Sequence, residues 1–166
     1  MYGHRDTGEI NLEVNKMSFY DYLVFIHVFS AIIGVGPGFV MTYIVTKASN
    51  MTELKHAYRL RKRIHVFIMI GGALLLITGI WMGLMNTYLF HQGWYIISFI
   101  LFMIVLGFGP ALLAPRLKPI KEILKRYRGE EIPEKYYHLS KQLFLYERIT
   151  NLILIVIIAL MILKPF

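Results

Sequence analysis

Four long runs with almost no charged residue constrain this chain more than any other feature of its sequence. The runs cover about residues 22–46, 64–85, 94–114 and 149–163. Roughly 20 consecutive apolar residues are enough to cross a bilayer as an α-helix, and within a bilayer only helices and closed barrels satisfy their own backbone hydrogen bonds. The sequence therefore predicts an all-α, polytopic membrane protein with four transmembrane helices in one bundle.

The Lys and Arg residues gather between these runs. Fifteen of the 18 lie in the stretches 47–63 and 116–148, whereas the connection 86–93 has none. Short loops rich in Lys and Arg stay on the cytoplasmic side, so we expect both stretches in the cytoplasm, both termini outside, and the protein in the plasma membrane. The net charge of +8 then indicates attraction to anionic lipid head groups rather than a nucleic-acid partner, because the cations flank membrane-length runs.

Residues 1–18 are polar and lack the apolar core of a cleavable signal peptide. We expect them to form an extracytoplasmic tail on a single transmembrane domain that covers residues 19–166, and Met17 is an alternative start. The chain contains no cysteine. Disulfides, thiolate metal sites and cysteine nucleophiles are therefore excluded.

Helical extensions are expected on the cytoplasmic side. Asn50 and Glu53 have the spacing of a capping box, which predicts a helix that begins there and continues into the second run. The last run is short, so its helix is expected to begin near Pro133 and to enter the membrane around Leu143.

A Gly-Pro motif in the first run is echoed in the third. The two motifs are GVGP at 34–37 and GFGP at 107–110, and both runs are expected to cross in the same direction, which is compatible with two similar helical hairpins. Proline removes a backbone donor, so each motif is expected to kink its helix. Paired interruptions of this kind mark a binding site in some transporters, but tighter helix packing is the simpler explanation.

His27 is the only ionisable side chain well inside these runs, which contain no Asp, Glu, Lys or Arg. An ionisable group inside a membrane is a functional hypothesis by default, and neutral imidazole is a common ligand of haem iron. Two interpretations stay open: haem or metal ligation by His27, or a structural hydrogen bond to a neighbouring helix through Ser98, Thr78 or Asn151.

Small residues share a helix face with two of the histidines, because a spacing of seven returns to nearly the same face. Such stripes let helix backbones approach closely, and they also leave room beside a ligand for a flat macrocycle. The pattern does not separate these two uses. The stripes are His27, Ala31, Gly34 and Gly38 in the first run, and His65, Gly72, Gly79 and Gly83 in the second.

The expected depths of the histidines restrict a haem site. His27 lies near the outer side and His65 at the inner edge, so one haem within a subunit cannot use both. An outer site would pair His27 with His91 or with His27 of a second subunit, and an inner site would pair His65 with His138. A less favoured alternative is a soft-ion site for Cu(I), formed by Met82, Met85 and His91.

Three segments resemble those of known membrane families. The first run, YLVFIHVFSAIIGVGPGF at 22–39, resembles the first helix of the membrane protoporphyrinogen oxidase family and of CopD-type copper-resistance domains. Arg63 with IMIGGALLLITGIWMG at 68–83 resembles the second helix of that oxidase family, and Gly93-Trp94 resembles the start of its third. The resemblance implies haem binding at His27.

The third run departs from the oxidase pattern, since Ser98 stands where that family has a functionally important lysine. This difference argues against porphyrinogen oxidation. A closer likeness, which includes PALLAPRLKPI at 110–120, is to a small four-helix bacterial family of predicted integral membrane proteins whose domain has no assigned function.

The leading hypothesis is a plasma-membrane protein that binds haem b through His27 and serves redox chemistry or the assembly of a respiratory complex. One alternative is a non-enzymatic subunit or scaffold, as a homodimer or within a larger membrane complex. The other is a carrier of small solutes or metal ions that uses the Gly-Pro kinks. The runs carry no carboxylate for ion coupling, and no acid–base pair or nucleophile for hydrolysis is visible, so enzymatic activity is left open.

Overall fold

The computed structural model describes residues 18–165, and all regular structure in that part of the chain is helical. The expected polar tail lies outside the described residues, apart from Ser18. The elements are α1 (Phe19–Thr46), α2 (Met51–Met85), the 3₁₀-helix η1 (Thr87–His91), α3 (Gly93–Phe108), the π-helical turn η2 (Gly109–Leu113), α4 (Ala114–Arg126) and α5 (Glu134–Leu163).

Four helices in the described part are long and apolar enough to cross a membrane, because α3, η2 and α4 form one continuous helical rod. The others are α1, α2 and α5. The predicted all-α class and the four spans are confirmed.

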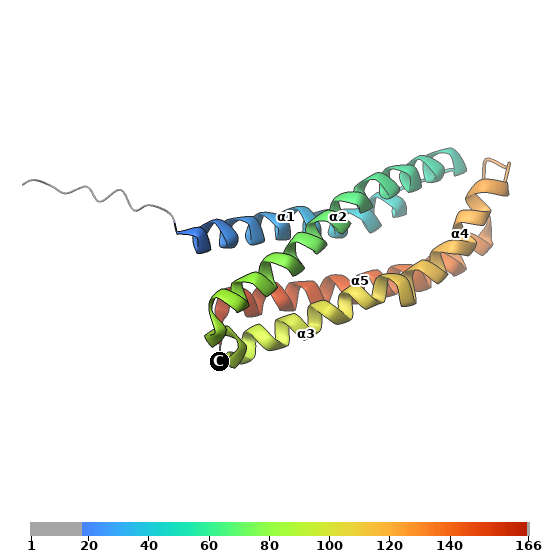
Figure 1. Cartoon of the computed structure of the whole chain (residues 1–166). Helices are drawn as coiled ribbons and strands as arrows, with labels where there is room; N and C mark the ends of the chain where they lie inside the picture. Colours follow the sequence, from blue (N-terminus) through green and yellow to red (C-terminus); the bar gives the residue numbers. More distant parts are fainter. Residues whose placement is uncertain (1–17, 166) are drawn as a thin grey trace, which may run out of the picture.

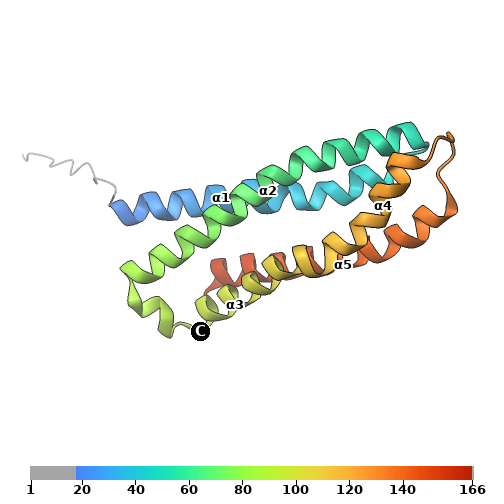
Figure 2. The same cartoon turned by 45° about the vertical axis from the view of Figure 1, so that its right-hand side comes forward.

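The helices pair as two hairpins (Figures 1 and 2). α1 lies along α2, and the rod of α3, η2 and α4 lies along α5. The two hairpins contact each other where α1 approaches α5 and where α2 approaches α4. The α3 backbone does not come close to the backbone of α1 or α2. The pairing of the first run with the second, and of the third with the fourth, is as expected from the sequence.

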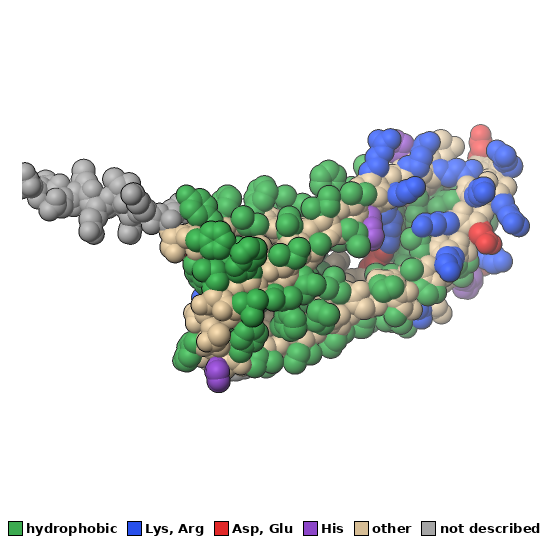
Figure 3. Space-filling model, in the orientation of Figure 1, with side chains coloured by type: hydrophobic (Ala, Val, Ile, Leu, Met, Phe, Trp, Pro, Cys, Tyr) green, Lys and Arg blue, Asp and Glu red, His purple; other side chains and the backbone are tan. Residues whose placement is uncertain are grey.

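The two ends of the bundle differ in chemistry (Figure 3). Lys and Arg side chains gather at the end that carries the α1–α2 and α4–α5 connections, and apolar side chains cover the rest of the visible face. We call this the charged end. The opposite end, which carries η1, the start of α3 and the C-terminus, we call the aromatic end, because Tyr88, Phe90 and Trp94 lie there.

The best-packed apolar core lies at the charged end. It joins all four helical rods. Five of its side chains are fully buried: Val45, Met51, Leu54, Ile120 and Leu143. The 35 residues of α2 give a length of about 52 Å at 1.5 Å per residue. This exceeds the hydrocarbon thickness of about 30 Å, so the packed charged end extends the bundle beyond the membrane as helix rather than loop.

The local signals for helix starts act as expected. Asn50 is the N-cap of α2, and its side chain accepts a hydrogen bond from the Glu53 amide at 2.8 Å. The Glu53 carboxylate accepts one in turn from the Ser49 amide, also at 2.8 Å. Pro133 occupies the N-cap position of α5, where its fixed φ suits the chain entering a helix.

The two Gly-Pro motifs differ in backbone structure. α1 remains one α-helix through Pro37, whereas Pro110 lies within the π-helical turn η2. Proline has no backbone N–H to donate, and a π turn accommodates this missing hydrogen bond while the helix continues. The sequence echo is therefore not repeated in the backbone, and the expected change in the helix is seen only at the second motif.

α1 and α2 cross at a pair of glycines. A Cβ placed on Gly71 would lie 2.5 Å from the Gly34 Cα and 2.9 Å from the Ser30 carbonyl oxygen, so only hydrogen fits between the backbones. Gly72, which the sequence placed on the packing stripe, would meet only the end of Leu106 at 4.0 Å. The predicted stripe was wrong by one residue here, because a step of one residue turns the contact face by about 100°.

Candidate functional site

His27 lies on α1, eight residues after its start, which is about 12 Å along the helix axis. Its Nδ1 is 2.8 Å from the hydroxyl oxygen of Thr78 on α2. The next residue, Gly79, leaves room for the ring, because a Cβ there would lie 3.5 Å from the His27 Cε1. The structural hydrogen bond considered from the sequence is therefore present, and its partner is Thr78.

The hydrogen bonds of Thr78 favour one tautomer of His27. The Thr78 hydroxyl has one proton, which it donates to the Leu74 carbonyl oxygen at 2.6 Å. We therefore assign the proton between the two side chains to His27 Nδ1, which donates to Thr78. Nε2 then carries a free lone pair, and it has no hydrogen-bond partner among residues 18–165.

This arrangement matches that of metal-binding histidines, which usually donate the second ring N–H to an oxygen acceptor that fixes the ring. Only one histidine, His27, has this arrangement among the described residues. Within the described part of the chain, no group of three or more His, Asp or Glu side chains is placed to hold a metal ion.

Two of the other candidate histidines, His65 and His91, are exposed and lie at different levels from His27. His65 is thirteen residues before Thr78 on α2, about 20 Å toward the charged end, so it cannot share a haem with His27. His91 ends η1 beyond the end of α2, and no hydrogen bond connects it to His27 or Thr78. Of these three candidate histidines, His27 is thus the only one that is half-buried.

The two candidate glycines beside His27 are in contact with other helices. A Cβ on Gly34 would lie 3.0 Å from the Gly71 backbone, and a Cβ on Gly38 would lie 3.5 Å from the Asn151 side-chain oxygen. At both positions the small side chain serves close helix packing. A macrocycle at His27 would therefore have to approach from the Nε2 side of the ring rather than over Gly34.

A second polar group, which the sequence analysis missed, lies between the hairpins toward the charged end. Arg61 on α2 forms an ion pair with Glu147 on α5, and both side chains are less than a tenth exposed, at 9% and 8%. Thr42 on α1 donates a hydrogen bond to the other Glu147 oxygen at 2.6 Å. One carboxylate thus connects three helices and both hairpins.

Glu147 lies within the membrane-spanning length of α5. It is sixteen residues before Leu163, or about 24 Å, which is shorter than the hydrocarbon thickness of about 30 Å. The boundary expected at Ile149 left this residue outside the fourth apolar run. A helix entering the membrane around Leu143, as the sequence predicted, already places Glu147 inside.

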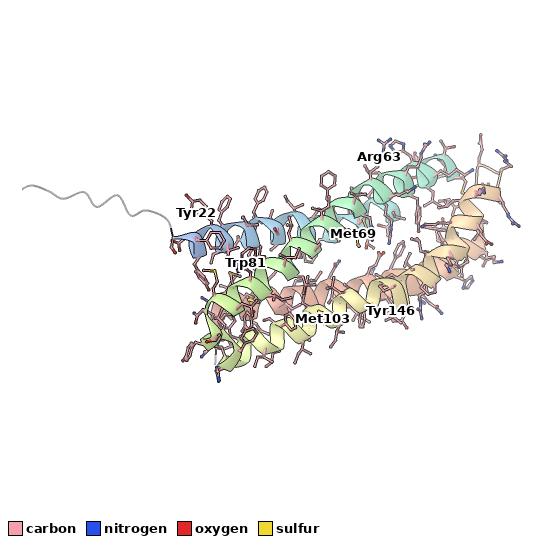
Figure 4. The ribbon with its side chains drawn as sticks, viewed as in Figure 1. Tyr22, Arg63, Met69, Trp81, Met103 and Tyr146 are labelled. Carbon is pink, nitrogen blue, oxygen red and sulfur yellow. The ribbon has the colours of Figure 1, made fainter. Side chains whose placement is uncertain are left out.

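Arg116 on α4 lies at the same level of the bundle as Glu147. Its guanidinium donates to the Leu112 carbonyl oxygen at 2.9 Å and to the Tyr146 hydroxyl at 3.1 Å, and it lies 4.1 Å from the centre of the Tyr146 ring. Tyr146, labelled on α5 in Figure 4, is next to Glu147. We call Thr42, Arg61, Arg116, Tyr146 and Glu147 the polar layer.

The ion pair also sets the register between α2 and α5. His65 is four residues from Arg61 toward the aromatic end, and His138 is nine residues from Glu147 toward the charged end. Their levels differ by about 20 Å along the bundle. The structure does not bring these two histidines together as an inner ligand pair.

The comparisons with known proteins agree with the membrane architecture. Residues 21–165 match a family model described as a predicted integral membrane protein, DUF2269. No curated protein and no solved structure matches the chain. A similarity to the protoporphyrinogen oxidases or to CopD-type domains is not shown.

Proposed function

The chain belongs to the DUF2269 family of predicted integral membrane proteins, and we propose that it binds haem b through His27 and serves redox chemistry or the assembly of a respiratory complex. The observation that carries this proposal is the imidazole of His27. Its Nδ1 is fixed by Thr78, and its Nε2 has no partner within the described residues.

The surroundings of His27 support a neutral imidazole, which is the form that binds iron. The ring lies on the Thr78–Gly79 segment of α2, within helices whose length and composition suit a bilayer. A bound haem would supply one-electron redox chemistry. His27 would hold it, and Thr78 would orient His27; a second ligand would come from His27 of another subunit.

We expect the purified protein, supplied with haemin in lipid nanodiscs, to show a Soret and an α band in a reduced-minus-oxidised spectrum. His27→Ala should lose these bands, because it removes the one half-buried imidazole among residues 18–165. His65→Ala is the matched control, since this histidine is exposed and lies about 20 Å away along α2; its spectrum should equal that of the wild type. A wild-type spectrum without these bands, or an unchanged His27→Ala spectrum, would contradict haem binding.

A second candidate is a non-enzymatic subunit of a larger membrane complex, and the exposure of α3 favours it. α3 buries only Trp94, Tyr95 and Ser98, and its backbone approaches neither helix of the first hairpin. In this case the protein should co-purify with a larger assembly in mild detergent, and His27→Ala should leave that assembly intact while the haem spectrum is absent.

We also propose that the charged end faces the cytoplasm from the plasma membrane, which the Lys and Arg distribution supports. Since the chain has no cysteine, single cysteines can report its orientation. On intact cells, a membrane-impermeant maleimide should label Thr87→Cys, at the aromatic end. It should label Ser49→Cys, in the α1–α2 connection, only after the cells are permeabilised. The reverse pattern would overturn this orientation.

A further inference from the structure

The polar layer contains more positive than negative charge. Arg61 and Arg116 reach adjacent residues of α5, Glu147 and Tyr146, so the two guanidinium groups lie at one level of the bundle. Glu147 is the only carboxylate bonded to either of them among residues 18–165. One cationic charge in this layer therefore has no counter-charge from the described chain.

The two guanidinium groups also have unused donors. Arg61 Nη1 and Arg116 Nε are both buried and have no hydrogen-bond partner within the described residues. The whole Arg61 side chain is more than nine-tenths buried. Buried donors are rarely left unpaired, because each lost hydrogen bond costs free energy. Two of them in one layer, together with the excess charge, indicate an anionic oxygen acceptor from outside the chain.

A further cation and an imidazole lie near the polar layer on α4 and α2. Lys121 is five residues from Arg116 on α4, and the imidazole of His65 is one turn from Arg61 on α2. Lys121 belongs to α4, and both His65 and Lys121 are exposed. Figure 3 shows a hollow between the hairpins where the apolar surface meets the Lys and Arg side chains, with His and acidic atoms on its wall.

The depth of the layer identifies the source of the acceptor. Measured from the aromatic end, Arg61 is 24 residues before Met85, or about 36 Å, and Glu147 is about 24 Å before Leu163. These values bracket the hydrocarbon thickness of about 30 Å. The layer therefore lies at the edge of the hydrocarbon in one leaflet, within reach of the lipid phosphates.

We propose that the polar layer binds the phosphate group of an anionic phospholipid that enters the hollow between the two hairpins. Guanidinium groups form strong charge-assisted hydrogen bonds with phosphate oxygens, and basic sites between transmembrane helices recognise anionic head groups. Both arginine side chains are long and flexible, so each can turn an unused N–H toward the lipid without a movement of its helix. A bound water would satisfy a donor but would not balance the charge.

The test is the affinity of the full-length protein for phosphatidylglycerol, measured by lipid titration with native mass spectrometry. Arg116→Gln removes one unused donor and its charge, and Arg61→Lys keeps a cation for Glu147 while it removes the other. We expect each variant to weaken binding of the first phosphatidylglycerol about tenfold or more, as the loss of a hydrogen bond to a charged group implies. Arg59→Gln removes an equal charge from an exposed position on α2 and should change the affinity less than about twofold.

Equal affinities in the wild type, Arg116→Gln and Arg61→Lys would overturn the proposal, as would equal weakening by Arg59→Gln, which would indicate diffuse attraction to the charged end. If Arg61→Lys does not fold, Arg116→Gln decides alone, because it leaves the ion pair with Glu147 intact. A second arm uses phosphatidylcholine nanodiscs with inorganic phosphate. If inorganic phosphate raises the unfolding temperature as much as phosphatidylglycerol does, the site binds a free anion and the lipid assignment is wrong.

Discussion

Replacing Glu147 with alanine is expected to lower the free energy of unfolding by about 3–5 kcal/mol, since removal of one partner leaves a buried charge without compensation. Arg61 would lose its counter-charge, and the Thr42 hydroxyl would lose its acceptor. The carboxylate is a bonded link between the two hairpins, so we expect them to separate in the variant. Titration with sodium dodecyl sulfate in mixed micelles, followed by circular dichroism, measures the change.

Two further variants separate the ion pair from other effects. The double substitution Arg61→Met with Glu147→Leu removes both charges and should recover most of the lost stability, because apolar residues can replace a buried ion pair with little cost. Glu134→Ala removes an exposed carboxylate from the same helix and should stay within about 0.5 kcal/mol of the wild type. If Glu147→Ala were as stable as Glu134→Ala, the ion pair would not hold the hairpins together.

Gly71→Ala is expected to destabilise the protein by about 1–3 kcal/mol, the usual cost of an extra methyl group in a packed core. The methyl would lie 2.5 Å from the backbone of Gly34, and neither backbone can yield without moving α1 away from α2. His27 and Thr78 lie across the same pair of helices, so haem binding should weaken in this variant as well.

Gly72→Ala is the matched control for this effect. Its methyl would meet only the flexible end of Leu106 at 4.0 Å, and alanine has a helix propensity about 1 kcal/mol better than glycine. The control should therefore be neutral or slightly stabilised in the same titration. Equal destabilisation by Gly71→Ala and Gly72→Ala would contradict the glycine crossing.

The four spans and the capped start of α2 could be predicted from the sequence, because each depends on a local pattern. A run of about 20 apolar residues must form a helix in a bilayer, and the Asn50–Glu53 spacing identifies a helix start without any tertiary information. The hydrogen bond of His27 could be predicted only as one of three possibilities, since the choice among Ser98, Thr78 and Asn151 depends on how α1 lies against its neighbours.

The polar layer could not be predicted in the same way. Arg61 and Glu147 are 86 positions apart, and each looks like an ordinary cation or acid near a membrane boundary. Only the packing of α2 against the second hairpin shows that they are paired and buried. The helix crossing was missed by one residue for a similar reason, since both Gly71 and Gly72 allow close approach and only the rotation of α2 selects Gly71.

The measurement that bears most directly on His27 is an optical titration of haemin into the protein in nanodiscs, with Thr78→Val and Thr78→Ser beside the wild type. Thr78→Val keeps the side-chain shape but removes the acceptor for Nδ1, and loss of such a supporting contact weakens metal affinity about 10- to 100-fold. Thr78→Ser keeps the hydroxyl and should bind like the wild type. We expect a saturable Soret shift that Thr78→Val weakens by this factor; no shift in the wild type, or equal affinity in Thr78→Val, would contradict ligation by His27.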